Sequence, residues 1–147
     1  MRKRPAPYAS VEDVEMAFYE ALQRGDTDAL MACWADEEEI ACVHPGGARL
    51  VGAEAIRGAF QSLFAAGHGV AVRPEQVRQV QVGSCCVHHV VERIDILTDD
   101  GVQAAHVVAT NVYSHTAQGW RLVVHHASPG APAAAVVVPL ASPSVLH

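Results

Sequence analysis

Aromatic and basic residues are both scarce in this sequence of 147 residues. Aromatic side chains make up 5% of it, so a folded core must consist mainly of valine, alanine and leucine. Lysine and arginine together number 10, against 16 aspartates and glutamates, and the formal net charge is -6. A nucleic-acid-binding domain usually has a basic face. The sequence therefore predicts no nucleic-acid partner.

Long apolar runs are also lacking. The basic residues at the start of the chain precede two prolines and an acidic helical pattern, whereas a secretion signal would continue into an apolar segment. The apolar run at residues 133–140 is too short to cross a bilayer. We therefore expect no membrane partner and a cytoplasmic location.

The four cysteines show no Cys-x-x-Cys spacing, which argues against a zinc knuckle and against a thioredoxin-type redox site. Cys85 and Cys86 are adjacent, and neighbours in a strand point to opposite faces, so they are poor partners for a disulfide. The nine histidines also lack a fixed metal-binding spacing. We expect buried, reduced cysteines, and neither a metal nor a cofactor.

The first half of the sequence has a helical period. Ser10 begins a capping-box-like pattern, and apolar residues recur at helical spacing over residues 11–24, which predicts a first helix. Glu15 and other charged residues are predicted to lie on the opposite, polar face of this helix. Asp26 can cap a short second helix that runs to about Trp34. A third amphipathic helix is predicted over residues 53–66.

The second half of the sequence changes to a period of two. After a short first strand that ends at His44-Pro45, turn residues at Pro74-Glu75 interrupt the pattern, and strands are predicted at about residues 77–82, 85–97, 103–115 and 119–127. Helices followed by strands indicate an α+β domain. We predict a cone-shaped roll, in which N-terminal helices pack on one strongly curved antiparallel sheet.

The ends of the chain differ in composition from its middle. Residues 1–10 read as an N-terminal arm, and residues 129–147 as a Pro/Ala-rich C-terminal tail without a clear period. The domain itself is therefore predicted to span residues 11–128.

Two stretches resemble the nuclear transport factor 2-like (NTF2-like) superfamily, in particular its SnoaL-like branch and the association domain of calcium/calmodulin-dependent kinase II. One is Asp26 to Phe64, with its short helix, its strand stopped by His44-Pro45, its Gly-rich loop and its second helix. The other is the ending Gly119-Trp-Arg-Leu-Val-Val-His-His-Ala-Ser128. The resemblance spans residues 11–128 and implies a conical pocket, enclosed between the sheet and the helices, that binds a small molecule.

The resemblance also implies a candidate base. In ketosteroid isomerase the residue before this proline is an aspartate that acts as general base, and in the kinase association domain it is a glutamate. His44 occupies the position here, and a neutral imidazole can act as a base. The isomerase's oxyanion-donating tyrosine falls on Phe18, which has no donor, with Tyr19 beside it. Steroid isomerisation is therefore not expected.

The arginines of the association-domain pocket fall near Glu92, on Asn111 and on Ala127, so this pocket does not attract the same anion in the same way. In each histidine pair, at residues 88–89 and 125–126, one imidazole ring is expected to point into the pocket and the other outward, and the sequence leaves open which of the two points inward. Besides His44, the candidate pocket residues are Phe18, Trp34, Phe60, Glu92, Asn111, Tyr113, His125 and His126. For Phe18 and Trp34, periodicity alone favours an ordinary core position.

Two functions stay open at this point. One is small-molecule binding without catalysis, as in an assembly module. The other is a SnoaL-like enzyme that performs proton transfer, hydration or cyclisation with His44 as base, oriented by Asn111 and Tyr113. Burial is predicted to lower the pKa of His44 below its usual value of about 6.5. Valines on both faces of the long strands further predict a homodimer through the outer face of the sheet.

Overall fold

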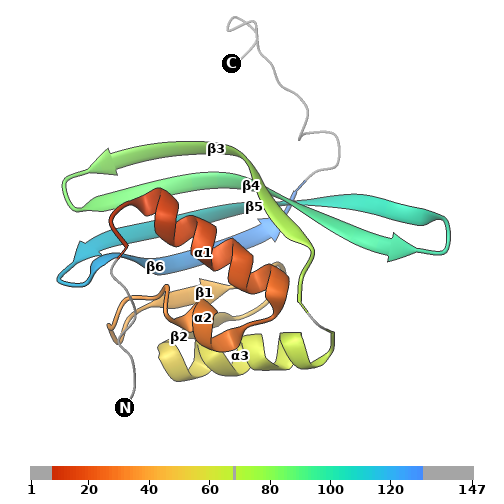
Figure 1. Cartoon of the computed structure of the whole chain (residues 1–147), viewed down its shortest axis with the longest axis horizontal. Coiled ribbons are helices and arrows are strands. Elements are labelled where there is room, and N and C mark those ends of the chain that lie inside the picture. The colour runs from red at the N-terminus through yellow and green to blue at the C-terminus, as the bar shows by residue number, and fades with distance from the viewer. Residues whose placement is uncertain (1–7, 68, 131–147) are drawn as a thin grey trace, which may run out of the picture.

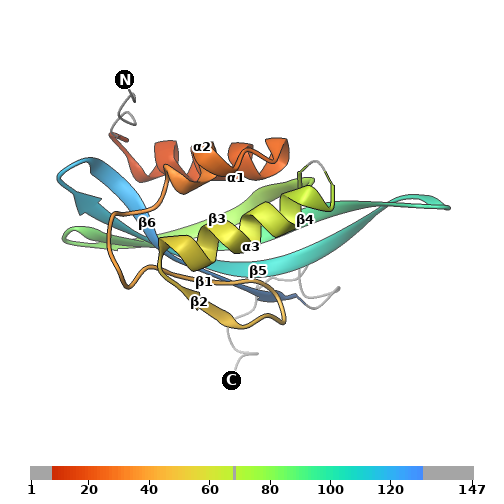
Figure 2. The same cartoon turned by 90° about the horizontal axis from the view of Figure 1, so that it is seen from below.

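The computed structural model describes residues 8–67 and 69–130. The described elements are α1 (Val11–Arg24), α2 (Thr27–Met31), β1 (Ala41–Val43), β2 (Arg49–Val51), α3 (Ala53–Ala65), β3 (Val72–Val82), β4 (Cys85–Thr98), β5 (Gly101–Thr116) and β6 (Gly119–Pro129). The strands form one sheet in the order β2-β1-β6-β5-β4-β3. The helices lie on one face of this curved sheet (Figures 1 and 2). The predicted α+β class is confirmed.

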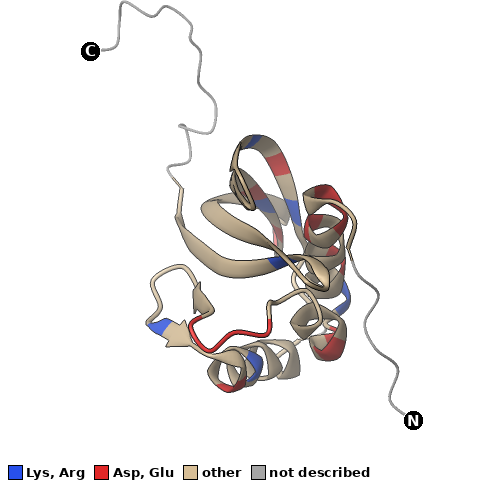
Figure 3. Ribbon diagram, turned by 90° about the vertical axis from the view of Figure 1, so that its left-hand side faces the viewer, with Lys and Arg blue, Asp and Glu red and all other residues tan. Residues whose placement is uncertain are grey.

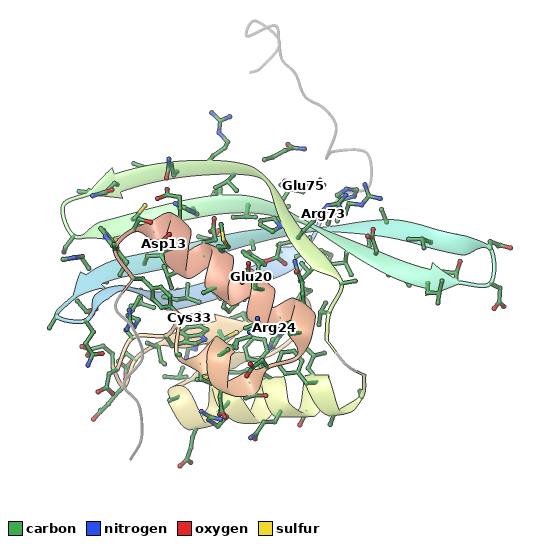
Figure 4. All side chains as sticks on the ribbon, in the orientation of Figure 1. Asp13, Glu20, Arg24, Cys33, Arg73 and Glu75 are labelled. Atoms are coloured by element: carbon green, nitrogen blue, oxygen red, sulfur yellow. The ribbon has the colours of Figure 1, made fainter. Side chains whose placement is uncertain are left out.

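Helix α1 begins and ends where its capping residues predict. The Ser10 hydroxyl accepts a hydrogen bond from the Asp13 amide at 3.1 Å, and Gly25 ends the helix in the left-handed region, with φ of 69°. Asp13, Glu20 and Arg24 project from the side of α1 that faces solvent (Figure 4). The assignment of Glu15 to that polar side was wrong, because Glu15 is buried in the middle of the apolar stripe.

The second helix is shorter than predicted. The Asp26 carboxylate caps α2 by accepting from the Ala29 amide at 3.0 Å, but the helix stops at Met31. Beyond it the backbone leaves the helical path to pair with β6: the Ala35 amide donates to the Leu122 carbonyl, and the Leu122 amide donates to the Cys33 carbonyl. Helix α3 agrees with the predicted range to within one residue at its end.

The sheet is mixed rather than antiparallel throughout, which corrects the prediction. Strand β1 pairs in parallel with β6, while every other neighbouring pair is antiparallel. Strand β2 lies in a stretch that was predicted as a loop, and it pairs with β1. The two-residue hydrophobic period and the turn residues identify strands and local hairpins. Strands β1 and β6, however, are about 80 residues apart in the sequence, and no local pattern specifies whether such a distant pair is parallel or antiparallel.

The turn predicted at Pro74-Glu75 does not form, because β3 runs through it as one edge strand. The register between β3 and β4 shifts between Glu75 and Arg78, and Gln76 has a φ of 47°, so the strand accommodates its irregularity in a bulge. An edge strand also tolerates the missing amide of proline. Arg73 and Glu75 form an ion pair of 3.4 Å where β3 bends (Figure 4).

The hairpin of β4 and β5 is longer than the rest of the sheet. Its far end, from Asp95 to Ala104, extends beyond β3 and β6 (Figure 1). The four cysteines are unpaired, as predicted, and three of them are buried, but Cys85 is exposed. Among the residues that the structure describes, no helix has both the length and the apolar character needed to span a membrane. The predicted 1–10 arm and 129–147 tail lie largely outside the described residues.

Candidate functional site

A cavity of about 580 Å³ lies between α3, the turn after β1 and the inner face of the sheet. Its walls are mostly aliphatic, and the exposed residues among them, such as Pro45 and Leu63, lie at the side open to solvent. The lining residues are Leu22, His44, Pro45, Ala59, Phe60, Ser62, Leu63, Ala66, Val70, Val72, Glu92, Ile94, His125 and Ala127. The polar groups that could act on a ligand are few, and three of them are His44, Glu92 and His125.

His44 enters the cavity from the end of β1. Pro45 follows it and stops the strand, so His44 lies directly after the end of β1. Its ring packs edge to face on Phe60 of α3, with 4.9 Å between the ring centroids. Burial lowers the pKa of His44, in the direction predicted from the sequence. The ring is therefore neutral at neutral pH and keeps a nitrogen that can accept a proton.

His125 reaches the cavity from β6 and is held by Asn111 of β5. Its Nδ1 lies 2.6 Å from Asn111 Oδ1. An amide oxygen can only accept, so His125 Nδ1 carries the hydrogen and donates it. Burial, reinforced by the neighbouring rings of His44 and His126, lowers the pKa of His125 to about 3. At neutral pH the ring is thus neutral, and its Nε2 is an acceptor.

Glu92 lies on β4, opposite His125 in the cavity. Its Oε2 is 4.0 Å from His125 Nε2 and accepts a hydrogen bond of 2.6 Å from the Tyr19 hydroxyl. Burial raises the pKa of Glu92 to about 6, and the negative charge of Glu15 adds to the rise, while the Tyr19 hydrogen bond opposes it. Glu92 is therefore mainly ionised at neutral pH, but it can take up a proton readily.

A buried hydrogen-bond network lies behind these cavity residues. Asn111 Nδ2 donates to the Tyr19 oxygen at 3.0 Å, which links the amide that holds His125 to the phenol that holds Glu92. Further along, Glu15 Oε2 accepts from the Tyr113 hydroxyl at 2.8 Å and lies 2.9 Å from His88 Nδ1. Asn111 Nδ2 also lies 3.4 Å from the same Glu15 oxygen. The network joins α1 to three strands, and each shared hydrogen bond offsets the cost of burying its polar groups.

The candidate pocket residues fall into three groups in the structure. His44, Phe60, Glu92 and His125 line the cavity, and Phe18, Asn111 and Tyr113 form the buried layer behind it. Phe18 fills the space between the sheet and α3, with its ring centroid 5.1 Å from that of His125.

The remaining two candidates, Trp34 and His126, do not line this cavity, although the Trp34 ring packs against Phe18 in the core. Trp34 borders a separate depression beside α2. His126 is exposed on the other face of the sheet, because consecutive strand residues alternate between faces. The same alternation buries His88 and exposes His89.

Sequence reasoning missed the part of the site that α1 provides. Glu15 and Tyr19 are four residues apart, within the stripe that includes Phe18, so helical spacing places both toward the sheet. This four-residue spacing is the feature of the sequence that could have predicted both residues to be part of the site. Phe18 has no donor, but Tyr19 at the next position supplies a phenol hydroxyl that bonds Glu92. A hydroxyl from the first helix is thus present, contrary to the reading based on Phe18 alone.

Charged groups elsewhere among the described residues do not assemble into a comparable site. Residues 36–39 are an acidic, exposed segment of the loop between α2 and β1, seen as the long red loop in Figure 3. Within residues 8–67 and 69–130, no three histidine, cysteine, aspartate or glutamate side chains are grouped so that they could hold a metal ion.

Comparison with known families agrees with this architecture. The sequence model of the SnoaL-like domain matches residues 11–132. The chain belongs to the SnoaL-like domain family. A comparison with curated proteins found no match.

Two solved structures share both sequence and fold with this SnoaL-like domain. One is a candidate calcium/calmodulin-dependent protein kinase type II association domain from Thiobacillus denitrificans, 33% identical, with a TM-score of 0.78, over 85% of this chain and 98% of that one. The other is a candidate dehydratase of the NTF2-like family from Streptomyces avermitilis, 30% identical, with a TM-score of 0.72, over 82% of this chain and 93% of that one.

A more distant structure supports the fold alone. It is a ketosteroid isomerase-like protein from Erwinia carotovora atroseptica, 18% identical, with a TM-score of 0.66, over 83% of this chain and 95% of that one. The SnoaL-like chain therefore has the fold that its NTF2-like resemblance implied.

Proposed function

We propose that the cavity of this SnoaL-like domain binds a small, mostly apolar organic molecule. The observation that carries the proposal is the convergence of His44, Glu92 and His125 on one mostly apolar cavity. A ligand site typically combines apolar walls with a few well-placed polar groups. A volume of about 580 Å³ falls within the range of small-molecule sites, roughly 300–1,000 Å³. Hydrogen bonds from Tyr19 to Glu92 and between Asn111 and His125, joined by the Tyr19–Asn111 bond, support two of these polar groups without a ligand.

The test is a mass-spectrometric search for small molecules that co-purify with the native protein, compared with a variant whose cavity is filled. Ala59→Trp places a large ring in the cavity lining on α3. Ala55→Trp is the matched control, because Ala55 lies one turn earlier on α3 and is exposed outside the lining. We expect a compound that accompanies the wild type and the Ala55→Trp variant but is depleted from the Ala59→Trp variant. Equal recovery from all three proteins would contradict the proposal.

A second candidate function is proton-transfer catalysis with His44 as general base. It is favoured by a carboxyl group, Glu92, whose pKa is raised to about 6, in the same cavity as the neutral imidazole of His44, since groups that titrate near neutral pH are effective in acid–base catalysis. The dehydratase-like relative from Streptomyces avermitilis is compatible with such chemistry. The reaction would be proton abstraction from carbon, followed by isomerisation or loss of water.

Deuterium exchange tests this second function directly. The compound recovered from the protein would be incubated in D2O with wild type, with His44→Gln and with the exposed control His89→Gln. We expect deuterium to enter a carbon position of the compound with the wild type and the control, and about a hundredfold more slowly with His44→Gln, as for removal of a general base. Exchange that is equally fast with His44→Gln would exclude His44 as the base.

We also propose that the domain forms a homodimer through the outer face of its sheet. The outer face is defined here by Val80, Val87, Val91, Val108, Val112 and Val124, which alternate with the inward-facing residues. Val80 is 57% exposed and Val108 is 43% exposed, so these side chains present apolar surface to water. Sedimentation should show a dimer for the wild type and for Met16→Lys, and a monomer for Val108→Lys. A wild-type monomer at micromolar concentration would contradict the proposal.

A further inference from the structure

The arrangement of acceptors in the cavity indicates which kind of ligand it takes. We propose that the ligand has an apolar body and an ammonium head, and that the head is bound between the Glu92 carboxylate and His125 Nε2. This inference rests on the proposed small-molecule function and adds the chemical class of the ligand. It follows from hydrogen-bond directions, from charge and from the position of the polar groups in the cavity.

The hydrogen-bond directions make Glu92 and His125 an acceptor pair. The Asn111 amide has its Nδ2 toward the Tyr19 oxygen and the Glu15 carboxylate, which leaves Oδ1 toward His125. Because Oδ1 cannot donate, the His125 hydrogen must be on Nδ1, and Nε2 presents a lone pair. Asn111 is thus a positioning residue that selects the tautomer of His125.

The separation of the two acceptors suits a shared donor. Glu92 Oε2 and His125 Nε2 are 4.0 Å apart, which is too long for a direct hydrogen bond. An ammonium nitrogen carries several hydrogens, and one such group can donate to both acceptors at the ordinary distance of about 2.7–3.0 Å. A ligand carboxylate has no hydrogen to offer to either of them.

The charge of the cavity leads to the same ligand class. Among the described residues that line it, Glu92 is the only aspartate or glutamate, and none is a lysine or arginine. Burial keeps His44 and His125 neutral at neutral pH, so neither compensates a second anion. A cation would relieve the unfavourable burial of the Glu92 charge, whereas an anionic ligand would add repulsion in a site partly shielded from water.

The rest of the cavity accommodates the apolar body of such a ligand. Leu22, Leu63, Val70, Val72 and Ile94 line the same cavity as the acceptor pair. Burying a hydrocarbon body there would provide affinity through the hydrophobic effect, and the acceptor pair would provide selectivity.

The experiment compares ligands that share a body and differ only in the head. Cyclohexylmethylamine, cyclohexylmethanol and cyclohexanecarboxylate would be titrated into the wild-type protein near neutral pH, with amide chemical shifts as the readout, and the series would be repeated on benzyl and n-hexyl bodies. We expect the amine to bind at least about tenfold more tightly than the carboxylate, with the alcohol between them. A carboxylate that binds as tightly as the amine would overturn the inference while leaving small-molecule binding intact. Failure of every body and head to bind would reject the proposed function itself.

Two further measurements assign the preference to Glu92. In Glu92→Gln the advantage of the amine over the alcohol should disappear, whereas in Glu54→Gln, which changes an exposed glutamate of α3, it should persist. An advantage that persists in Glu92→Gln would exclude Glu92 as the partner of the ammonium group.

Amine binding to the wild type should also weaken as the pH falls through about 6, and this measurement needs no substitution. Glu92 is protonated there. Its titratable surroundings are Tyr19 and Glu15 on α1, Cys42 on β1, and His125 on β6. Amine affinity that stays constant between about pH 8 and about pH 5 would contradict the role of the carboxylate.

Discussion

Removal of a single hydroxyl group should show whether Tyr19 tunes the acidity of Glu92. In Tyr19→Phe the ring remains in its edge-to-face contact with Phe18, but the hydroxyl that donates to Glu92 at 2.6 Å and accepts from Asn111 at 3.0 Å is lost. The Tyr19 hydrogen bond is the interaction that lowers the pKa of Glu92 against the effect of burial. We therefore expect the pKa of Glu92 to rise above its value of about 6.

The stability of the Tyr19→Phe variant should depend on pH. A hydrogen bond to a charged group contributes about 1.5–3 kcal/mol, and one between neutral groups about 0.5–1.5 kcal/mol. Glu92 already binds its proton more tightly when folded than when unfolded, so its burial destabilises the protein as the pH rises from about 4.5 to about 6. Without Tyr19's hydroxyl this penalty grows and extends to higher pH. The loss of stability should therefore be larger at about pH 8 than at about pH 5.

Two measurements test this reasoning. NMR titration of the side-chain carboxyl carbon gives the pKa of Glu92, and urea denaturation at the two pH values gives the free energy of unfolding. Tyr113→Phe is the matched control, because it removes the same atom from the same network, but from the hydroxyl that bonds Glu15. The control should leave the pKa of Glu92 nearly unchanged. A Glu92 pKa that stays the same or falls in Tyr19→Phe would refute the assignment.

Three other predictions follow from local packing and burial. Gly58→Ala should raise the free energy of unfolding by about 0.5–1 kcal/mol, because the added methyl group on α3 meets no atom within 4 Å. In Gly69→Ala the methyl group would collide with the backbone at the end of α1, so this variant should lose stability in the same denaturation assay. Phe60→Ala should cost about 3–5 kcal/mol and the half-exposed Leu63→Ala much less, and equal losses would place Phe60 outside the core. The His125 ring should stay neutral down to about pH 5 in an NMR titration, and protonation above about pH 6 would contradict its burial. Because the folded protein binds this proton more weakly than the unfolded chain, the contribution of His125 to the free energy of unfolding should be complete above pH 6.5 and lost as the pH falls from there toward about 3.

Local sequence patterns determined most of the secondary structure. Ser10 and Gly25 fixed the bounds of α1, because capping depends on residues within one turn of the helix end. The period of two identified β4, β5 and β6. The proline after His44 also marked the end of β1, which has a neighbouring strand on both sides and therefore cannot continue through a residue without an amide hydrogen.

The pairing of the strands and the composition of the site were decided only in the tertiary structure. The parallel contact of β1 with β6 and the bulge in β3 depend on partners far away in the sequence. Alternation predicted that one residue of the pair at 125–126 faces inward, but only the position of the helices determines that it is His125. Glu15 is charged, and charge in a helix ordinarily indicates a solvent-exposed position. Its burial became possible because Tyr113 and Asn111, nearly a hundred residues away in the sequence, donate hydrogen bonds to its carboxylate, and no pattern within a single helix contains that information.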